Sequence, residues 1–174
     1  LSAVRSETGT GQKFGEALVA LPTLLYFDAN RDIPKVKKGI ASISQPESWG
    51  YRAAHRFSHE GTEWSRSLDN LLVWLYWLDV GSFERAVTLI NETVFPGKTK
   101  FLKGIRKQPP QAIVQNGNAS HRIDRLSSGE KSIVQILLQT EAHKTHLTWL
   151  VVDEMDAHFH PNMEHWFLKI LKKM

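Results

Sequence analysis

The stretch Leu147-Thr-Trp-Leu-Val-Val-Asp-Glu154 decides the fold class of this chain. Apart from Thr148, its first six residues are apolar, and such a short, nearly continuous run is typical of a strand buried on both faces of a mainly parallel sheet. Sheets of this kind belong to α/β proteins, in which ligands bind at the carboxyl ends of the strands. The stretch therefore predicts an α/β fold, with a polar site where the strand ends in two acids.

These two acids, Asp153 and Glu154, need a partner, because a carboxylate at the tip of a hydrophobic strand is stabilised only by a cation, hydrogen-bond donors or water. Asp153 is placed to hold a magnesium ion through a water molecule. Glu154 lies on the other side of the strand, where it could orient and deprotonate an attacking water. The alternative is a strand end whose acids simply reach solvent, and the acids alone do not decide between the two.

A second motif, Leu126-Ser-Ser-Gly-Glu130, opens the helix that we expect from Gly129 to about Glu141. Ser127 and Glu130 have the S-x-x-E spacing of a capping box. The first turn of a helix also exposes free backbone N–H groups, which can bind a phosphate. A plain helix cap is the alternative interpretation of the same residues.

Together the two motifs resemble the ABC-type ATPases. Leu126 to Glu130 is similar to their LSGGQ signature, and Leu147 to Glu154 looks like their Walker B strand with the catalytic glutamate after the aspartate. The separation, 153 − 129 = 24 residues, leaves room for one helix, a turn and one strand. Residues 153–161, DEMDAHFHP, look like the Walker B and D-loop of the RecF-like, OLD-like and Septu-type branch, which serves in DNA repair and anti-phage defence.

The resemblance implies a role for each residue of the signature-like motif. Ser127 and Gly129 would contact the γ-phosphate of an ATP held by the opposite subunit. Ser128 replaces the first glycine of the signature and Glu130 replaces its glutamine, and both would bind the same nucleotide.

The resemblance to the ABC-type ATPases likewise implies ATP and Mg²⁺ as cofactors. Asp153 would bind the magnesium ion and Glu154 would act as the general base. Asp156, His158 and His160 would belong to a D-loop that crosses the dimer interface. The same two histidines, with Asp156 and His165, could instead form a metal cluster.

The function implied is ATP binding and hydrolysis by a head-to-tail dimer or higher oligomer that regulates an effector such as a nuclease or toxin, in anti-phage defence. Two alternatives stay open. One is a DNA-repair ATPase that binds DNA directly; the basic segment Lys98 to Lys107 could contact its phosphates, although a solvated basic loop also explains this segment. The other is a non-catalytic scaffold that binds nucleotide only to hold an assembly together.

One motif of the family is missing. No G-x-x-x-x-G-K-[ST] pattern occurs, and Gly9 to Phe14 has the wrong spacing. The chain starts with Leu1 and stops within an amphipathic helical pattern at Met174. We therefore expect a partial ATPase domain whose phosphate-binding loop lies upstream of this sequence and whose ATPase activity is incomplete without it.

We expect one partial domain over residues 1–174, in three parts. Residues 1–62 would supply a strand at 20–27 and loops, residues 63–110 a helical hairpin and the basic segment, and residues 111–174 the signature helix, the Walker B strand and a final helix from Pro161. The hairpin would pair helices at 63–79 and 83–94, with Ser82 as the N-cap of the second. His143 is expected at the surface.

Composition excludes other classes of protein. The chain has 174 residues, 41% of them hydrophobic, a net charge of +4 and no cysteine. A disulfide framework, a cysteine-ligated zinc site, an iron–sulfur cluster and a thiol nucleophile are thereby excluded. No apolar run approaches the roughly 18 residues of a membrane span, and no signal peptide is recognisable. We therefore expect a cytoplasmic protein without a membrane partner.

Overall fold

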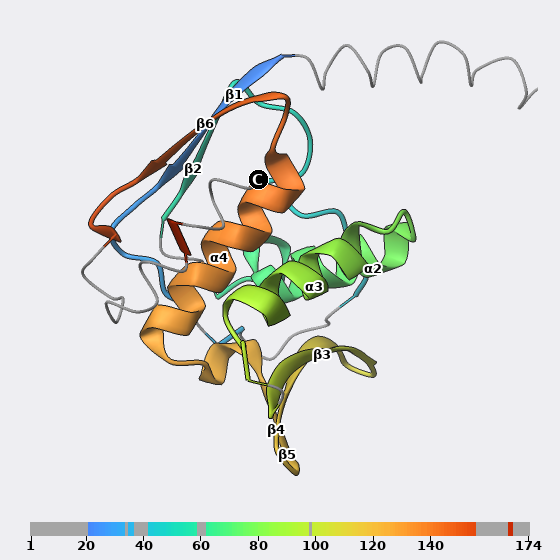
Figure 1. Ribbon diagram of the computed structural model, residues 1–174. Coiled ribbons are helices and arrows are strands. Elements are labelled where there is room, and N and C mark those ends of the chain that lie inside the picture. Colours follow the sequence, from blue (N-terminus) through green and yellow to red (C-terminus); the bar gives the residue numbers. More distant parts are fainter. Residues whose placement is uncertain are drawn as a thin grey trace, which may run out of the picture.

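The computed structural model describes residues 21–33, 35–36, 42–58, 62–97, 99–155 and 167–168. These ranges form a parallel sheet, an antiparallel sheet and three α-helices (Figure 1). The expected α/β class is confirmed at this level.

The parallel sheet carries the predicted strand end. Its order is β2 (Ala54–Phe57), β1 (Pro22–Phe27) and β6 (Leu147–Val152), with β1 in the middle. Pro22 pairs with Leu147 and Phe27 with Val152, so β1 and β6 begin and end together. Because parallel strands place their carboxyl ends at one edge of a sheet, the residues that follow β1 and β6 leave the sheet side by side.

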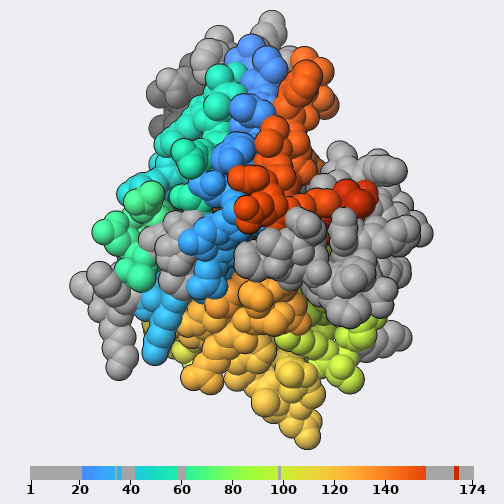
Figure 2. Space-filling view, turned by 90° about the vertical axis from the view of Figure 1, so that its left-hand side faces the viewer, coloured from blue at the N-terminus to red at the C-terminus, as the bar shows by residue number. Residues whose placement is uncertain are grey.

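The two faces of this sheet have different surroundings. On the inner face, Leu25 and Phe27 are fully buried, and α4 (Ser128–His143) packs against β1. On the outer face, Trp149 is 73% exposed and Leu24 is also open; Figure 2 shows the three strands side by side on this surface. The prediction that residues 147–152 are buried on both faces is therefore wrong for the described chain, because a continuous apolar run does not reveal how many faces are covered.

The helical hairpin is present, with different boundaries. Its helices are α2 (Leu68–Leu78) and α3 (Ser82–Thr93). Ser67 caps α2 by accepting a hydrogen bond from the Asn70 N–H, and a separate 3-10 turn, Trp64–Arg66, precedes it. Gly81, and not Ser82, is the N-cap of α3. The φ of Gly81 is +76°, a backbone conformation that glycine adopts at low energetic cost.

The basic segment is a strand over Lys100–Lys107, so the prediction of a loop is wrong, although Lys103, Arg106 and Lys107 are exposed. β3 (Lys100–Lys107), β4 (Pro110–Asn116) and β5 (Ala119–Arg122) form the antiparallel sheet. Leu102 points into the core while its neighbour Lys103 is exposed. The many lysines of the segment hide this alternation in the sequence.

One hydrophobic core joins the sheets and helices. It includes Leu25 from β1, Leu72 from α2, Ile90 from α3 and Leu137 from α4, all at most 1% exposed. His143, at the end of α4, is also buried, at 7% exposed. Its predicted surface position is wrong because the helix continues past Glu141 and keeps this side chain on its inner face.

Several predictions lie outside the described residues. They are the loops expected before the strand at 20–27, the D-loop residues Asp156, His158 and His160, and the final helix from Pro161, of which only Phe167 and Leu168 are described. Among the helices that are described, none is both long and apolar enough to span a bilayer.

Candidate functional site

The two acids that follow β6 lie at the carboxyl edge of the parallel sheet. The Asp153 N–H donates to the carbonyl oxygen of Phe27 at 2.9 Å, so the pairing with β1 continues one residue past the strand. The Tyr26 hydroxyl approaches Asp153 Oδ2 at 3.4 Å. Glu154 has a φ of +43°, and this left-handed backbone turns the chain directly after the acid pair. Both acids are exposed, and both carboxylates are therefore accessible to a ligand from solvent.

A buried arginine holds the backbone of the acid pair. Arg31 is 3% exposed, and its Nη1 and Nη2 atoms donate to the carbonyl oxygens of Asp153 and Glu154 at 2.5 and 3.1 Å. Nη1 also donates to the carbonyl oxygen of Asp28 at 2.6 Å. The remaining nitrogen, Nε, donates to the Ser132 hydroxyl of α4 at 2.7 Å. One guanidinium thus fixes the ends of β1 and β6 relative to the first turns of α4.

The charge of this arginine is balanced by its surroundings. Burial lowers the pKa of Arg31, and the negative charges of Asp153, Glu154 and Asp28 act in the opposite direction. An arginine stays protonated in proteins, and here each guanidinium nitrogen has a hydrogen-bond acceptor. The site therefore combines a fixed buried positive charge with two exposed carboxylates.

The predicted capping box is confirmed at the start of α4. The Glu130 N–H donates to Ser127 Oγ at 3.4 Å, and the Ser127 N–H donates to Glu130 Oε2 at 2.9 Å. Ser127 and Ser128 are exposed, whereas Gly129 is buried. The two serine side chains are accordingly the part of this motif that an approaching molecule meets first.

Glu130 also forms an ion pair that the sequence did not suggest. Lys100, at the start of β3, places Nζ 2.7 and 2.8 Å from the two carboxylate oxygens. Burial by itself raises the pKa of Glu130, but the hydrogen bonds from Lys100 and from the Ser127 backbone outweigh it and leave this pKa below its usual value. Glu130 is therefore an ionised carboxylate whose charge Lys100 offsets.

The structure brings the two motifs to the same side of the molecule. In Figure 1, α4 begins on the side where β6 ends. Arg31 bonds both to the backbone of the acid pair and to Ser132 of α4, and Lys131 of α4 adds an ion pair to Asp32, with Nζ 2.8 Å from Oδ1. The acid pair and the capped start of α4 are thus the two parts of the candidate site, and Arg31 holds β6 and α4 in a fixed relation.

The side chains of this site are too few to bind a magnesium ion by themselves, so a bound ligand would have to supply further oxygen atoms. No group of three or more histidine or acidic side chains that could hold a metal occurs within the described ranges. Asp153 offers one exposed carboxylate. Magnesium is commonly bound by one or two carboxylates together with substrate phosphates and water, so the site suits a metal that arrives with a phosphorylated ligand.

The sequence did not predict the contacts that two residues of the site, Arg31 and Lys100, make with the two motifs. Arg31 lies 101 residues from Ser132 and 122 from Asp153 in sequence, and Lys100 lies 30 from Glu130. The spacing of residues within a short motif cannot predict contacts between residues so far apart in the sequence. The one available signal was that Arg31 closely follows the end of β1.

Comparisons with protein-family models, with curated proteins and with solved structures found no match for this chain.

Proposed function

We propose that this chain is part of an ABC-type ATPase, which binds and hydrolyses ATP with Mg²⁺ as a head-to-tail dimer. The observation that supports the proposal is the linkage through Arg31. A helix that begins with a signature-like cap and a strand that ends in an aspartate–glutamate pair share one buried cation, across more than 100 residues of sequence.

In this proposal the start of α4 binds the γ-phosphate of an ATP held by the opposite subunit. The N–H groups in the first turn of a helix have no intrahelical partner and favour an anion. Ser127 and Ser128 add exposed hydroxyls. The carboxylate of Glu130 would repel a phosphate, but its ion pair with Lys100 offsets that charge.

The acid pair supplies the other half of the chemistry. Asp153 binds Mg²⁺, which neutralises the phosphate oxygens when it is bound. Glu154 orients a water molecule and accepts its proton. Arg31 acts as a positioning residue, because its guanidinium donates to the backbone carbonyl oxygens of both acids and leaves their carboxylates available.

The proposal requires a phosphate-binding loop that this sequence does not contain, so the loop would come from a longer form of the protein. ATP-driven closure of the dimer would then gate an effector such as a nuclease or toxin, with anti-phage defence as the biological role. This last step follows from the family resemblance and not from a particular residue.

The test is ATP turnover by the full-length protein and by two variants. We expect Glu154→Gln to lower kcat by about 10² to 10⁴, because the general base is lost, while a nucleotide-bound dimer still forms. We expect Ser127→Arg to abolish turnover by blocking the partner's phosphate.

Two exposed residues offer matched controls. Glu92→Gln on α3 and Ser120→Arg on β5 make the same chemical changes outside the candidate site and should leave turnover unchanged. Turnover that survives Glu154→Gln would refute the assignment of the base. Nucleotide binding without turnover in the parent protein would favour the scaffold alternative.

A second candidate, a DNA-repair ATPase that binds DNA directly, is favoured by the antiparallel sheet. Lys103, Arg106 and Lys107 are exposed along β3. Phosphate contacts make binding steeply salt-dependent, and neutralising these three residues should flatten the dependence of the association constant on salt. Binding that is unaffected by this change would exclude β3 as the DNA contact.

A further inference from the structure

The outer face of the parallel sheet carries polar side chains at its carboxyl edge. Tyr26 pairs with Val151 and lies two residues after Leu24, so its side chain is on the same outer face. Asp153 follows Val151 by two residues while the pairing with β1 continues, which places its carboxylate on this face as well. Arg31, by contrast, holds the Asp153 backbone and bonds to α4 on the inner face.

The Tyr26 hydroxyl contacts the carboxylate of Asp153. It donates to Oδ2 at 3.4 Å, and no other residue that the structure describes bonds to this carboxylate. Hydroxyl-to-oxygen hydrogen bonds are usually about 2.7–2.8 Å long, and long contacts at such sites commonly shorten when the ligand binds. With Oδ2 bonded to Tyr26, Oδ1 is the oxygen left for a cation or its water.

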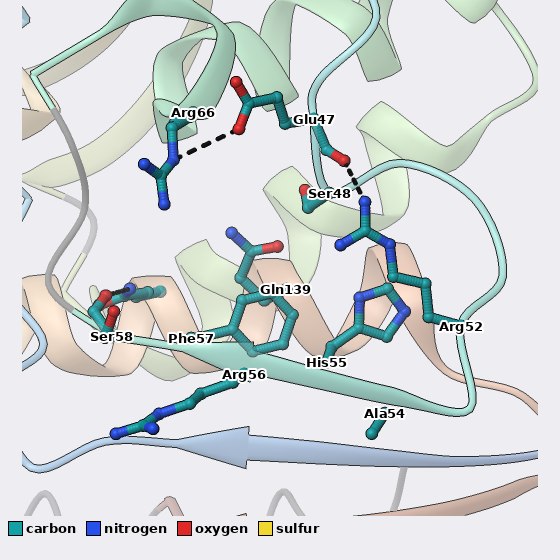
Figure 3. A pocket seen from close by; sticks show the side chains of 11 residues that line it. Glu47, Ser48, Arg52, Ala54, His55, Arg56, Phe57, Ser58, Arg66 and Gln139 are labelled. Atoms are coloured by element: carbon teal, nitrogen blue, oxygen red, sulfur yellow. Dashed lines mark hydrogen bonds and ion pairs between the residues drawn. The ribbon is translucent and has the colours of Figure 1, made fainter.

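An ion pair on the same face packs against the ring of Tyr26. Arg56 leaves β2 on the side away from His55, and its guanidinium points toward the end of β1 (Figure 3). This guanidinium lies 5.7 Å from the centroid of the Tyr26 ring, within the range of a cation–π interaction. Its Nε and Nη2 donate to Asp28 Oδ2 at 3.2 and 2.7 Å. The ends of β1 and β2 thus hold the ring of Tyr26 beside Asp153.

We propose that Tyr26 is a positioning residue for a divalent cation at Asp153, because its hydroxyl holds Oδ2 and thereby orients Oδ1. The inference rests on the proposed function, in which Asp153 binds Mg²⁺ together with a phosphorylated ligand. A carboxylate that binds a metal is commonly oriented by a hydrogen bond from a neighbouring group, and the loss of that group weakens metal binding by about 10-fold to 100-fold. Arg31 does not orient the carboxylate, since it bonds to the backbone of Asp153. Tyr26 lies outside both sequence motifs.

The test is the binding of Mn²⁺, a paramagnetic substitute for Mg²⁺, to the full-length protein with a non-hydrolysable ATP analogue, measured by electron paramagnetic resonance. Tyr26→Phe removes only the hydroxyl and should weaken Mn²⁺ binding about tenfold, the lower end of the usual range, because the contact is long. Affinity for the analogue without metal should not change. Tyr51→Phe is the matched control, because its exposed hydroxyl donates to the Pro22 carbonyl oxygen at the other end of β1, at 3.0 Å. This variant should keep the full affinity for Mn²⁺.

A double variant shows whether Tyr26 acts through Asp153. Asp153→Ala should weaken Mn²⁺ binding at least as much as Tyr26→Phe, and combining the two changes should weaken it no further. If Asp153→Ala binds Mn²⁺ normally, the proposed function and this inference both fail. If Asp153→Ala weakens binding but Tyr26→Phe behaves like Tyr51→Phe, the inference alone is overturned. Additive losses in the double variant would also overturn it, because Tyr26 would then act independently of Asp153.

Discussion

At the scale of single residues, His143 shows what burial does to a titratable group. Its ring stacks on that of His55, with centroids 4.4 Å apart, and its Nε2 lies 3.1 Å from Gln139 Oε1. Burial lowers the pKa of His143 to about 3, and the positive charges that His55 and Arg52 can carry add to this effect. The imidazole is therefore neutral in the folded chain at every pH at which the protein is expected to work.

This burial predicts a loss of stability in acid. In the unfolded chain, His143 regains its ordinary pKa of 6.5, so below that pH the unfolded state binds a proton that the folded state does not. Between pH 7 and pH 5, the free energy of unfolding should fall by about 2 kcal/mol on this account. Urea denaturation at both pH values measures it.

The control for this prediction is His146, which lies three residues away and is exposed. His146→Gln should keep the full pH dependence, whereas His143→Leu should lose a large part of it. An equal slope in the His143→Leu variant would show that another group causes the effect.

At the scale of secondary-structure elements, the cap of α4 has a structural role apart from any catalytic one. The capping box provides hydrogen-bond partners for the N–H groups of Ser127 and Glu130, and Lys100 connects it to β3. Sequence spacing was sufficient to predict the box, because both of its partners lie within four residues. The ion pair to β3 was not predictable, since it depends on how the antiparallel sheet docks.

We expect Ser127→Ala to lower the free energy of unfolding by about 1 kcal/mol, the usual effect of removing an N-cap side chain. Ser127→Asp keeps a capping oxygen and should restore most of this loss. If the longer protein hydrolyses ATP, Ser127→Asp should still impair turnover, because a carboxylate repels phosphate. Thermal or urea unfolding beside a turnover assay thus separates capping from catalysis.

The central strand β1 offers a second test at this scale, because adjacent leucines face opposite sides of the sheet. Leu25 is fully buried under α4, whereas Leu24 is 37% exposed. Leu25→Ala should lower the free energy of unfolding by about 2–5 kcal/mol and Leu24→Ala by less than about 1 kcal/mol. Equal losses in urea denaturation would mean that the outer face of the sheet is covered in solution.

At the scale of the whole molecule, a buried acid joins the helices to the antiparallel sheet. Asp69 of α2, at 2% exposed, accepts a hydrogen bond from the Ala112 N–H of β4 at 2.7 Å. Its other oxygen accepts from Arg122 of β5 at 3.1 Å. Burial raises the pKa of Asp69, and the bonds from Ala112 and Arg122 oppose that shift. The contact spans 43 and 53 residues of sequence.

Removing this contact should weaken the docking of the whole antiparallel sheet. Asp69→Ala leaves the Ala112 N–H buried without an acceptor and should lower the free energy of unfolding by about 2–4 kcal/mol. Glu92→Ala, on the exposed face of α3, provides a control with an expected change below about 0.5 kcal/mol. A loss at Asp69 no larger than at Glu92 would show that the contact adds nothing to stability.

The sequence by itself determined the features that depend on neighbours within a few residues. The apolar run before Asp153, the S-x-x-E spacing at Ser127 and the helical periods of α2, α3 and α4 all arise from short-range geometry, and each of these elements is present in the described residues. The candidate residues of the site were chosen from the resemblance of two short motifs, 126–130 and 147–154, to those of the ABC-type ATPases.

Only the tertiary structure decided how these elements meet. It showed that the outer face of β6 is open, that the basic segment is a strand, and that His143 is buried. It also placed the Arg31 guanidinium between the backbone of the two acids and Ser132 of α4. These properties depend on contacts between residues up to 122 apart in the chain, and hydrophobic periodicity contains no information about which faces such contacts cover.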